Sequence, residues 1–229
     1  MIEKQELENT LNIEIHDINL FEKAFTHRSF LNENKHKNYE SNERLEFLGD
    51  AVLQLLTSEF LFIKYEKNAE GILTAYRASI VNTVSLAEEA KRLEYGKFLR
   101  MSRGEETTGG RNREYILANT FEAVLGAIFL SSGIEVCKKF LEKNLFYKID
   151  KIVQEGEYRD AKSKFQEIVQ EKYDVTPIYK TLKEWGPDHD KNFEVGVYIK
   201  DKLTAKGTGA SKQKAENDAA KEALRKIES

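Results

Sequence analysis

The feature that most constrains this chain is the stretch from Asn42 to Leu53, which has the sequence NERLEFLGDAVL. Glu43, Glu46 and Asp50 are spaced so that a helix here would carry all three carboxylates on one face. Most other positions are apolar, which predicts a largely buried helix. The apolar positions that we expect inside the fold are Leu45, Phe47, Leu48, Ala51, Val52, Leu55 and Leu56. A buried carboxylate is costly without a cation, so we expect the fold to supply one.

A second polar pair stands in the most apolar stretch of the chain, YILANTFEAVLGAIFL. Asn119 and Glu122 lie on one face of a helix there, and a core helix does not need a glutamate. We therefore expect Glu122 to meet Glu46 and Asp50 across a helix interface. Such a set of oxygen ligands suits Mg²⁺ or Mn²⁺ rather than zinc. The alternative is that the acids pair with arginines such as Arg44, because buried acids are usually paired.

The chain changes character near residue 150. Residues 1–150 show one helical period after another, and the polar segment 151–159 predicts a linker. Residues 160–229 show a helical stripe, then alternating apolar residues, then a second helical stripe. We therefore expect a mainly α protein, with an all-helical domain followed by a small α-β-β-β-α domain.

Composition excludes several classes of protein. Charged residues make up 33% of the chain, but the net charge is only -3, so no bulk attraction to nucleic acid or lipid follows. The one cysteine, Cys137, excludes an intrachain disulfide and a cysteine-based zinc cluster, and it favours a reduced compartment. The N-terminal segment is charged, and no apolar run approaches the ~20 residues of a membrane span. We expect a soluble, cytoplasmic protein without a membrane partner.

Two further features of the helical half have competing interpretations. Four arginines surround flexible glycines, and they are Arg100, Arg103, Arg111 and Arg113. They could grip phosphates, or the segment could be an ordinary solvated loop. We expect His27 to be a hydrogen-bonded structural residue rather than a catalyst, because no nucleophile or acid stands beside it in the sequence.

The C-terminal module carries polar groups that could converge on one ligand. Gln166 and Gln170 are one turn apart on its first helix, and His189 lies in the loop GPDHDKNF between two strands. Lys212 and Lys214 begin its last helix, where free N–H groups and the helix dipole favour a phosphate. A helix, a loop and a helix start are the elements that can follow the grooves of an RNA duplex. The alternative is a solvated charged face.

The strings NERLEFLGDAVL, THRSF, EGILTAYRASIVN and ILANTFEAVLGAIFL resemble, in order and spacing, the motifs of bacterial ribonuclease III, a family of double-stranded-RNA endonucleases. The strings KSKFQE, GPDHDKNF and GASKQKAENDAA resemble the contact regions of a double-stranded-RNA-binding domain. The resemblance covers nearly the whole chain. It implies a ribonuclease III catalytic domain at 1–150 and a double-stranded-RNA-binding domain at 160–229.

The resemblance also implies roles for individual residues. The metal positions are Glu46, Asp50, Asn119 and Glu122. Asp50 and Glu122 are the expected catalytic residues, while Glu43 and Glu70 match supporting acids near the subunit interface and the substrate. The expected cofactor is Mg²⁺, which Mn²⁺ can replace. The expected RNA-binding residues are Gln166, Gln170, His189, Lys212 and Lys214.

By the same resemblance the protein is a homodimer in which each subunit cuts one strand of double-stranded RNA. The products carry a 5′-phosphate and a 3′-hydroxyl, and family members process precursors of ribosomal RNA and messenger RNA. Two residues depart from the family pattern. Asn119 stands where aspartate is frequent, which predicts weaker metal affinity, and Gln213 stands where a second basic residue is usual, which predicts a weaker phosphate contact.

Overall fold

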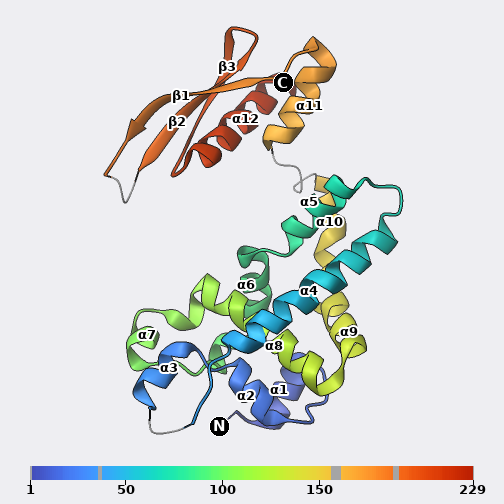
Figure 1. The fold of residues 1–229 in the computed structure, drawn as a ribbon, viewed down its shortest axis with the longest axis vertical. Coiled ribbons are helices and arrows are strands. Elements are labelled where there is room, and N and C mark those ends of the chain that lie inside the picture. The colour runs from blue at the N-terminus through green and yellow to red at the C-terminus, as the bar shows by residue number, and fades with distance from the viewer. Residues whose placement is uncertain (1, 36–37, 156–160, 188–190, 229) are drawn as a thin grey trace. The chain divides into compact units, whose positions relative to one another are not determined.

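The computed structural model describes residues 2–35, 38–155, 161–187 and 191–228. The chain forms two compact units, Met1–Tyr158 and Arg159–Ser229, which are traced in Figure 1. The first unit is helical, and the second joins helices to a 3-stranded sheet. This confirms the predicted mainly α fold, with a helical domain followed by a small α-β-β-β-α domain.

The first unit is built from helices connected by short turns. Its α-helices are α1 (Lys4–Leu11), α2 (Ile18–Ala24), α3 (Arg28–Glu33), α4 (Glu43–Lys64), α5 (Glu70–Ile80), α6 (Thr83–Arg92), α7 (Arg103–Thr107), α8 (Glu114–Ser132), α9 (Ile134–Asn144) and α10 (Ile149–Glu155). Its 3-10 turns are η1 (Tyr95–Lys97), η2 (Gly110–Asn112) and η3 (Phe146–Lys148). Figure 1 shows the long α4 crossing α8 near the middle of the unit.

The centre of this unit is α8. Every residue from Ile116 to Ile128 is buried except Asn119 and Glu122, which are partly exposed. Among the described residues, α8 is the helix whose length and apolar content would allow it to cross a membrane, but 61% of its most apolar window is buried inside the unit. Its apolar side chains therefore form the core around which the other helices pack.

Two glycines allow α4 and α8 to touch through their backbones. A Cβ atom on Gly49 would lie 1.8 Å from the carbonyl oxygen of Glu122, and one on Gly126 would lie 2.3 Å from the carbonyl oxygen of Leu45. Both distances are far below van der Waals contact, so any other residue at either position would push the helices apart. The crossing thus requires glycine on both helices.

The outer face of α4 departs from the sequence prediction. Leu45, Val52 and Leu56 are buried as expected, but Phe47 is 81% exposed and Leu55 is 62% exposed. Ala51, between them on the same face, is also exposed. The helix therefore has apolar residues on two faces, and its own chain covers only one. Periodicity predicts which positions are apolar, but it does not predict which of them the domain buries, so the expected burial of Phe47 and Leu55 was wrong.

The helical structure extends beyond the predicted domain end at residue 150. α10 runs to Glu155, and Ile152 and Val153 pack against the core of the first unit. The first part of the predicted linker, 151–155, is therefore helical. The remaining linker residues, 156–159, lie outside the described part of the chain.

The second unit places both of its helices on one face of an antiparallel sheet. Its elements are α11 (Ala161–Tyr173), β1 (Ile178–Trp185), β2 (Asn192–Ile199), β3 (Lys202–Gly209) and α12 (Lys212–Glu228). The strand order is β1-β2-β3, and Val197 lies opposite both Tyr179 and Ala205. Phe165 of α11 and Ala219 of α12 belong to its separate buried core. A helix face and an inward sheet face thus give this small unit a core of its own.

Candidate active site and nucleic-acid interface

The candidate active site lies where α4 crosses α8. Glu46 and Asp50 stand one turn before and directly after Gly49, and Glu122 stands one turn before Gly126. Because the glycines set the closest approach of the two backbones, they also bring these acids near one another. The structure therefore joins the two acidic segments that the sequence keeps about seventy residues apart.

The acids of this cluster act on one another electrostatically. Burial, together with the charges of Asp50 and Glu46, raises the pKa of Glu122 to about 7. Burial and the charges of Glu43 and Asp50 raise the pKa of Glu46, and a hydrogen bond with the Asn119 amide opposes that rise. Such shifts are expected for carboxylates that lack a neutralising cation.

No lysine or arginine neutralises the cluster in the part of the chain that the structure describes. The charged groups that shift the pKa of Glu46 and Glu122 are all carboxylates. Arg44, the partner considered from the sequence, is exposed and acts on Glu40 instead. Asp50 accepts a hydrogen bond from the neutral amide of Gln54 at 3.2 Å. Among the described residues, no basic side chain therefore offsets the charge of the cluster.

This set of donors suits a hard divalent cation. Glu46, Asp50 and Glu122 offer carboxylate oxygens, and Asn119 offers an amide oxygen, which are the ligand types that Mg²⁺ and Mn²⁺ prefer. A cation here would oppose both the burial and the repulsion that raise the pKa of Glu122. Among the described residues, no group of three or more acidic, histidine or cysteine side chains is close enough to hold an ion as it stands. These side chains would therefore have to turn toward the ion.

The structure places the two supporting acids in different surroundings. Glu43 begins α4, accepts a hydrogen bond from Ser41 at 2.8 Å and lies 3.9 Å from Arg28. It also raises the pKa of Glu46, so it borders the acidic cluster. Glu70 begins α5 and lines a groove beside the C-terminal half of α4 instead. Within one chain, Glu70 therefore belongs to the groove and not to the cluster.

The arginine-rich segment does not form a phosphate grip from three of its four arginines. Arg100 lies 4.6 Å from the centres of two aromatic rings, and Arg111 donates to two backbone carbonyls at 2.8 Å. Arg113 is paired with Glu105. Because these guanidinium groups bind inside the unit, the segment is ordered tertiary structure rather than either a phosphate grip or a solvated loop. Sequence alone does not reveal this, since glycine and arginine are common to all three cases.

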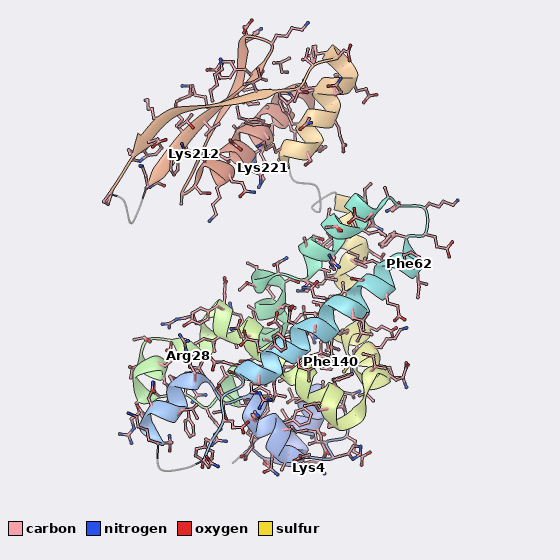
Figure 2. The ribbon with its side chains drawn as sticks, viewed as in Figure 1. Lys4, Arg28, Phe62, Phe140, Lys212 and Lys221 are labelled. Carbon is pink, nitrogen blue, oxygen red and sulfur yellow. The ribbon has the colours of Figure 1, made fainter. Side chains whose placement is uncertain are left out.

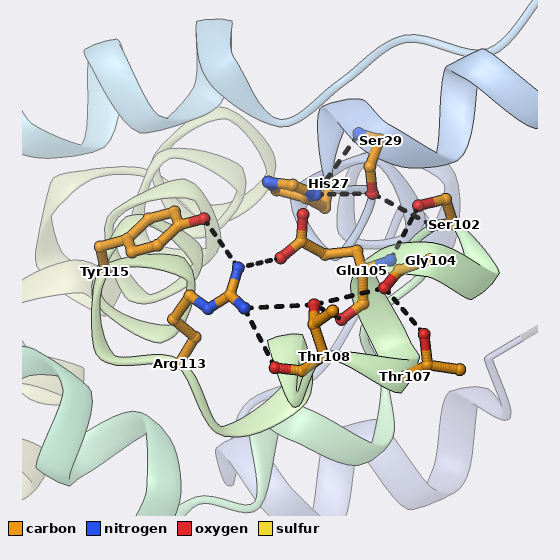
Figure 3. Close-up of polar contacts among 9 residues, drawn as sticks. All are labelled: His27, Ser29, Ser102, Gly104, Glu105, Thr107, Thr108, Arg113 and Tyr115. Carbon is orange, nitrogen blue, oxygen red and sulfur yellow. Dashed lines mark hydrogen bonds and ion pairs between the residues drawn. The ribbon is translucent and has the colours of Figure 1, made fainter.

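His27 has the structural role expected from the sequence. Its Nδ1 lies 2.8 Å from the hydroxyl of Ser29 and accepts the Ser29 N–H at 3.3 Å, which caps the start of α3. The Ser29 hydroxyl in turn accepts the N–H of Ser102 at 3.0 Å (Figure 3). Burial lowers the pKa of His27, so the ring favours its neutral form. These bonds confirm a hydrogen-bonded histidine.

Figure 3 shows a polar network that sequence reasoning missed, between α7 and the start of α8. Arg113 contacts Glu105, the carbonyl oxygen of Thr108 at 3.0 Å and the hydroxyl of Tyr115 at 3.4 Å. The same figure places His27 beside Glu105, whose charge acts on the pKa of His27. No pattern of residue spacing signals this network, because its members come from separate turns and helices.

The second unit exposes most of the predicted RNA-binding residues. Gln166 and Gln170 are exposed on α11, in a groove of about 660 Å³. Lys212 and Lys214 are exposed in the first turn of α12, and Figure 2 labels Lys212. His189 lies outside the described residues. The four described side chains are therefore accessible to a ligand, although Gln170 donates a hydrogen bond to Asp174 at 3.0 Å, and their role in RNA binding stays a prediction.

An acidic neighbour of Lys212 was not foreseen. Glu184, near the end of β1, lies 3.0 Å from the Lys212 ammonium and 3.5 Å from that of Lys191. The hydrogen bond from Lys212 lowers the pKa of Glu184. In the chain without RNA, the Glu184 carboxylate thus pairs with the Lys212 ammonium, which the sequence analysis expects to bind a phosphate.

Comparison with known proteins follows the same two units. Residues 17–149 match the family model for Ribonuclease-III-like domains, and residues 161–227 match the double-stranded RNA binding motif. The chain is 45% identical to ribonuclease 3 of Enterococcus faecalis over 222 residues, which is 97% of this chain and 96% of that protein. It is 45% identical to ribonuclease 3 of Streptococcus equi over 221 residues, which is 96% of each protein.

Solved structures give the same result for the helical unit. The nuclease domain of ribonuclease III from Campylobacter jejuni matches with a TM-score of 0.58 and 43% identity, over 66% of this chain and 96% of that chain. A second structure of that domain, which concerns flexibility in a region involved in dimer formation, matches with a TM-score of 0.57 and 44% identity, over 62% and 98% of the two chains. The chain therefore belongs to the ribonuclease III family and carries a double-stranded RNA binding motif after its nuclease-like domain.

Proposed function

We propose that this protein is an endoribonuclease that cleaves double-stranded RNA by Mg²⁺-dependent hydrolysis. Its ribonuclease III relatives and its double-stranded RNA binding motif support the substrate and the reaction class. The metal is proposed from the acidic cluster of α4 and α8, in which burial and neighbouring carboxylates raise the pKa of Glu46 and Glu122. Mg²⁺ is the proposed ion, and Mn²⁺ is proposed to replace it, because both prefer oxygen ligands.

Each residue of the cluster has a distinct proposed role. Asp50 and Glu122 would hold the ion, and Glu46 and Asn119 would complete the set of oxygen donors. When bound, the ion would supply a Lewis acid for the activation of water and for the charge on the scissile phosphate. Attack of water on phosphorus breaks the bond to the 3′ oxygen, which leaves a 5′-phosphate and a 3′-hydroxyl. Without the ion, the acids would repel the polyanionic substrate, so their charge makes ion binding a condition for substrate approach.

We also propose that the protein is a homodimer joined along α4. Phe47, Leu55 and Phe62 are 81%, 62% and 71% exposed, and their spacing places them along one side of the helix. Figure 2 labels Phe62 on α4. A stripe of large exposed apolar side chains is a feature of protein interfaces. Next to it lies a groove of about 420 Å³ that includes Leu73, so a second copy has both a stripe and a groove to cover. Two acidic clusters in one dimer would allow both strands of a duplex to be cut.

The proposed cellular role is the processing of ribosomal RNA precursors and messenger RNA in the cytoplasm. The support is the similarity to ribonuclease 3 proteins over nearly the full chain.

The decisive experiment is cleavage of a long RNA duplex. The wild-type protein with Mg²⁺ or Mn²⁺ is expected to produce short duplexes with 5′-phosphate ends, which ligation and end labelling can identify. Glu122→Gln should reduce the rate at least about a hundredfold, because it removes a charged ligand. Glu135→Gln, the same change at an exposed position of α9, is the matched control and should cleave normally. A Glu122→Gln variant that cleaved at the wild-type rate would refute the assignment of the site.

Asn119 favours a second candidate function, binding of RNA duplexes without cleavage. The amide gives the cluster one charge fewer than an aspartate would, which weakens its hold on a divalent ion. Under this candidate the protein retains duplexes in a gel-shift assay but cuts none with either ion. Recovery of cleavage in Asn119→Asp would then identify the missing charge as the cause.

The dimer has a separate test. Phe47→Ser should convert the protein from dimer to monomer in light scattering after size-exclusion chromatography, because it removes the most exposed ring of the stripe. Leu130→Ser is the control, since Leu130 is 54% exposed on α8 and lies outside the stripe. A Phe47→Ser protein that remained a dimer would place the interface elsewhere.

A further inference from the structure

Tyr115 lies on the same face of α8 as two members of the acidic cluster. Asn119 and Glu122 follow it at four and seven residues, so the three side chains project along one side of the helix. Tyr115 is 47% exposed, although it belongs to the most buried helix of the unit. The core does not need this ring for packing, and the ring stands one turn from the proposed metal site.

The hydroxyl of Tyr115 has an unused hydrogen. Arg113 Nη1 donates to its oxygen across 3.4 Å, and the guanidinium lies 5.8 Å from the centre of the ring (Figure 3). A guanidinium can only donate, so the phenol oxygen is the acceptor in this contact. Among the described residues, Arg113 is the one hydrogen-bond partner of this hydroxyl. The phenol therefore remains able to donate to a ligand.

Arg113 is held by the protein and is not free to meet a ligand. Its Nη1 is paired with Glu105, and its Nη2 donates to the carbonyl and hydroxyl oxygens of Thr108 at 3.0 and 3.2 Å. The N–H of Glu105 donates in turn to the hydroxyl of Ser102 at 3.2 Å. Arg113 is therefore a positioning residue, which fixes the phenol oxygen of Tyr115 and makes its O–H a stronger donor.

We propose that Tyr115 donates a hydrogen bond to a backbone phosphate of the RNA strand that is cut, next to the scissile bond. This inference rests on the proposed function and adds a substrate-contact residue to it. A neutral donor suits this position, because it attracts a phosphate oxygen without neutralising the acids needed for the ion. Phosphate contacts set the register of a nucleic acid on a protein, so this contact would align the strand over Asn119 and Glu122.

Tyr115→Phe tests the contact by removing one hydroxyl. We expect kcat/KM for a short RNA duplex to fall about tenfold, the effect of one hydrogen bond to a charged group. The melting temperature should be unchanged, because Tyr115 is 47% exposed and Arg113 keeps its contacts with Glu105 and Thr108. Tyr173→Phe is the matched control, since Tyr173 is 45% exposed on α11 and lies outside both proposed sites. An unchanged kcat/KM, or a loss that merely followed a fall in melting temperature, would overturn the proposal.

A chemically altered substrate locates the partner of the hydroxyl. In a set of duplexes, one phosphate at a time is replaced by an uncharged methylphosphonate near the cleavage point. At one position the replacement should lower kcat/KM of the wild-type protein about tenfold. It should leave kcat/KM of the Tyr115→Phe protein unchanged, because the same hydrogen bond is already absent. Additive losses at every position would overturn the contact.

The two proposals fail in different ways. If the wild-type protein cuts no RNA duplex with Mg²⁺ or Mn²⁺, the endoribonuclease function fails, and the contact of Tyr115 with a cut strand fails with it. If the wild-type protein cuts normally and Tyr115→Phe equals it on every substrate, only the role of Tyr115 fails. Arg113→Lys adds a check on positioning, since it should lower kcat/KM in the wild-type background and have little effect beside Tyr115→Phe.

Discussion

Glu89 and Glu122 are glutamates of the same unit, but Glu89 is paired with cationic side chains and Glu122 has carboxylates as neighbours. Glu89, on α6, is 2% exposed, accepts hydrogen bonds from Arg92 at 2.6 Å and Tyr147 at 2.7 Å, and pairs with Lys148 at 2.8 Å. Burial alone would raise the pKa of Glu89, but the contacts with Lys148, Tyr147 and Arg92 outweigh it and lower the pKa. Glu122 has acids as its charged neighbours, and its pKa rises to about 7.

The difference separates an acid that holds the fold together from one that costs stability. The Glu89 cluster joins α6 to η3 through groups that satisfy one another. The Glu122 cluster leaves charges without partners, which a protein tolerates where an ion or a substrate later supplies the partner. Glu89 has less exposed surface than Glu122, so burial by itself does not distinguish the two acids. The direction of the pKa shift does distinguish them.

The largest expected effect on stability comes from substitution of Glu89, the paired acid. Glu89→Ala should lower the free energy of unfolding in urea by about 3 to 5 kcal/mol, because it leaves the half-buried Lys148 without its buried partner. Glu59→Ala is the control, since Glu59 forms an exposed pair with Lys138 and its removal should be scarcely measurable. Equal effects of the two changes would break the distinction between the Glu89 cluster and a surface ion pair.

The next effect is the pH dependence that Glu122 imposes. Its pKa is raised from 4.5 to about 7, so between these values the folded state holds a proton that the unfolded state has lost. The stability from this group is therefore full below pH 4.5 and is lost as the pH rises through about 7. We expect the free energy of unfolding of Glu122→Gln to exceed that of wild type by about 2 to 3 kcal/mol at pH 8 and to equal it near pH 4. A pH-independent difference would show that Glu122 is not repelled by its neighbours.

A divalent ion should restore the stability that the ionised acids of the cluster remove at high pH. At pH 8 and low ionic strength, Mn²⁺ or Mg²⁺ at a hundred times its dissociation constant should stabilise the fold by about 2.7 kcal/mol, which calorimetry would detect as a higher melting temperature. A chelator should remove the gain. Glu122→Gln should show much less of it, whereas Glu135→Gln should match wild type. Equal stabilisation of Glu122→Gln and wild type would place the ion at another site.

The smallest effect concerns Asn119. Asn119→Asp adds a fourth carboxylate to the cluster and removes the amide that bonds to Glu46. Without a divalent ion, we expect a loss of about 1 kcal/mol in stability at pH 8, the equivalent of just under one further unit of pKa shift. With the ion bound, Asn119→Asp should be more stable than wild type, because the added carboxylate binds the ion more tightly. Isothermal titration with Mn²⁺ would measure the affinity, and a weaker affinity in Asn119→Asp would contradict the proposed ligand set.

Parts of the candidate site could be read from local sequence. Asn119 and Glu122 stand out because they interrupt an apolar helix, and Glu46 and Asp50 because their spacing places them on one helical face. The mutual pKa shifts agree with their expected proximity, while their role as metal ligands stays a prediction. The network of Arg113 and Tyr115 was beyond sequence reasoning, since arginine can pair with a carboxylate, a carbonyl or a phosphate with equal chemical ease.

By itself, the sequence determined that helices fill the first half of the chain, that a small α-β-β-β-α module follows, and that acids occur within apolar helices. These are consequences of periodicity and composition, which are local properties. The tertiary structure decided that Gly49 and Gly126 bring the acids together, that Phe47 stays outside and that Arg113 binds inward. The physical reason is that burial and pairing depend on distant parts of the chain that come within reach only when the helices pack.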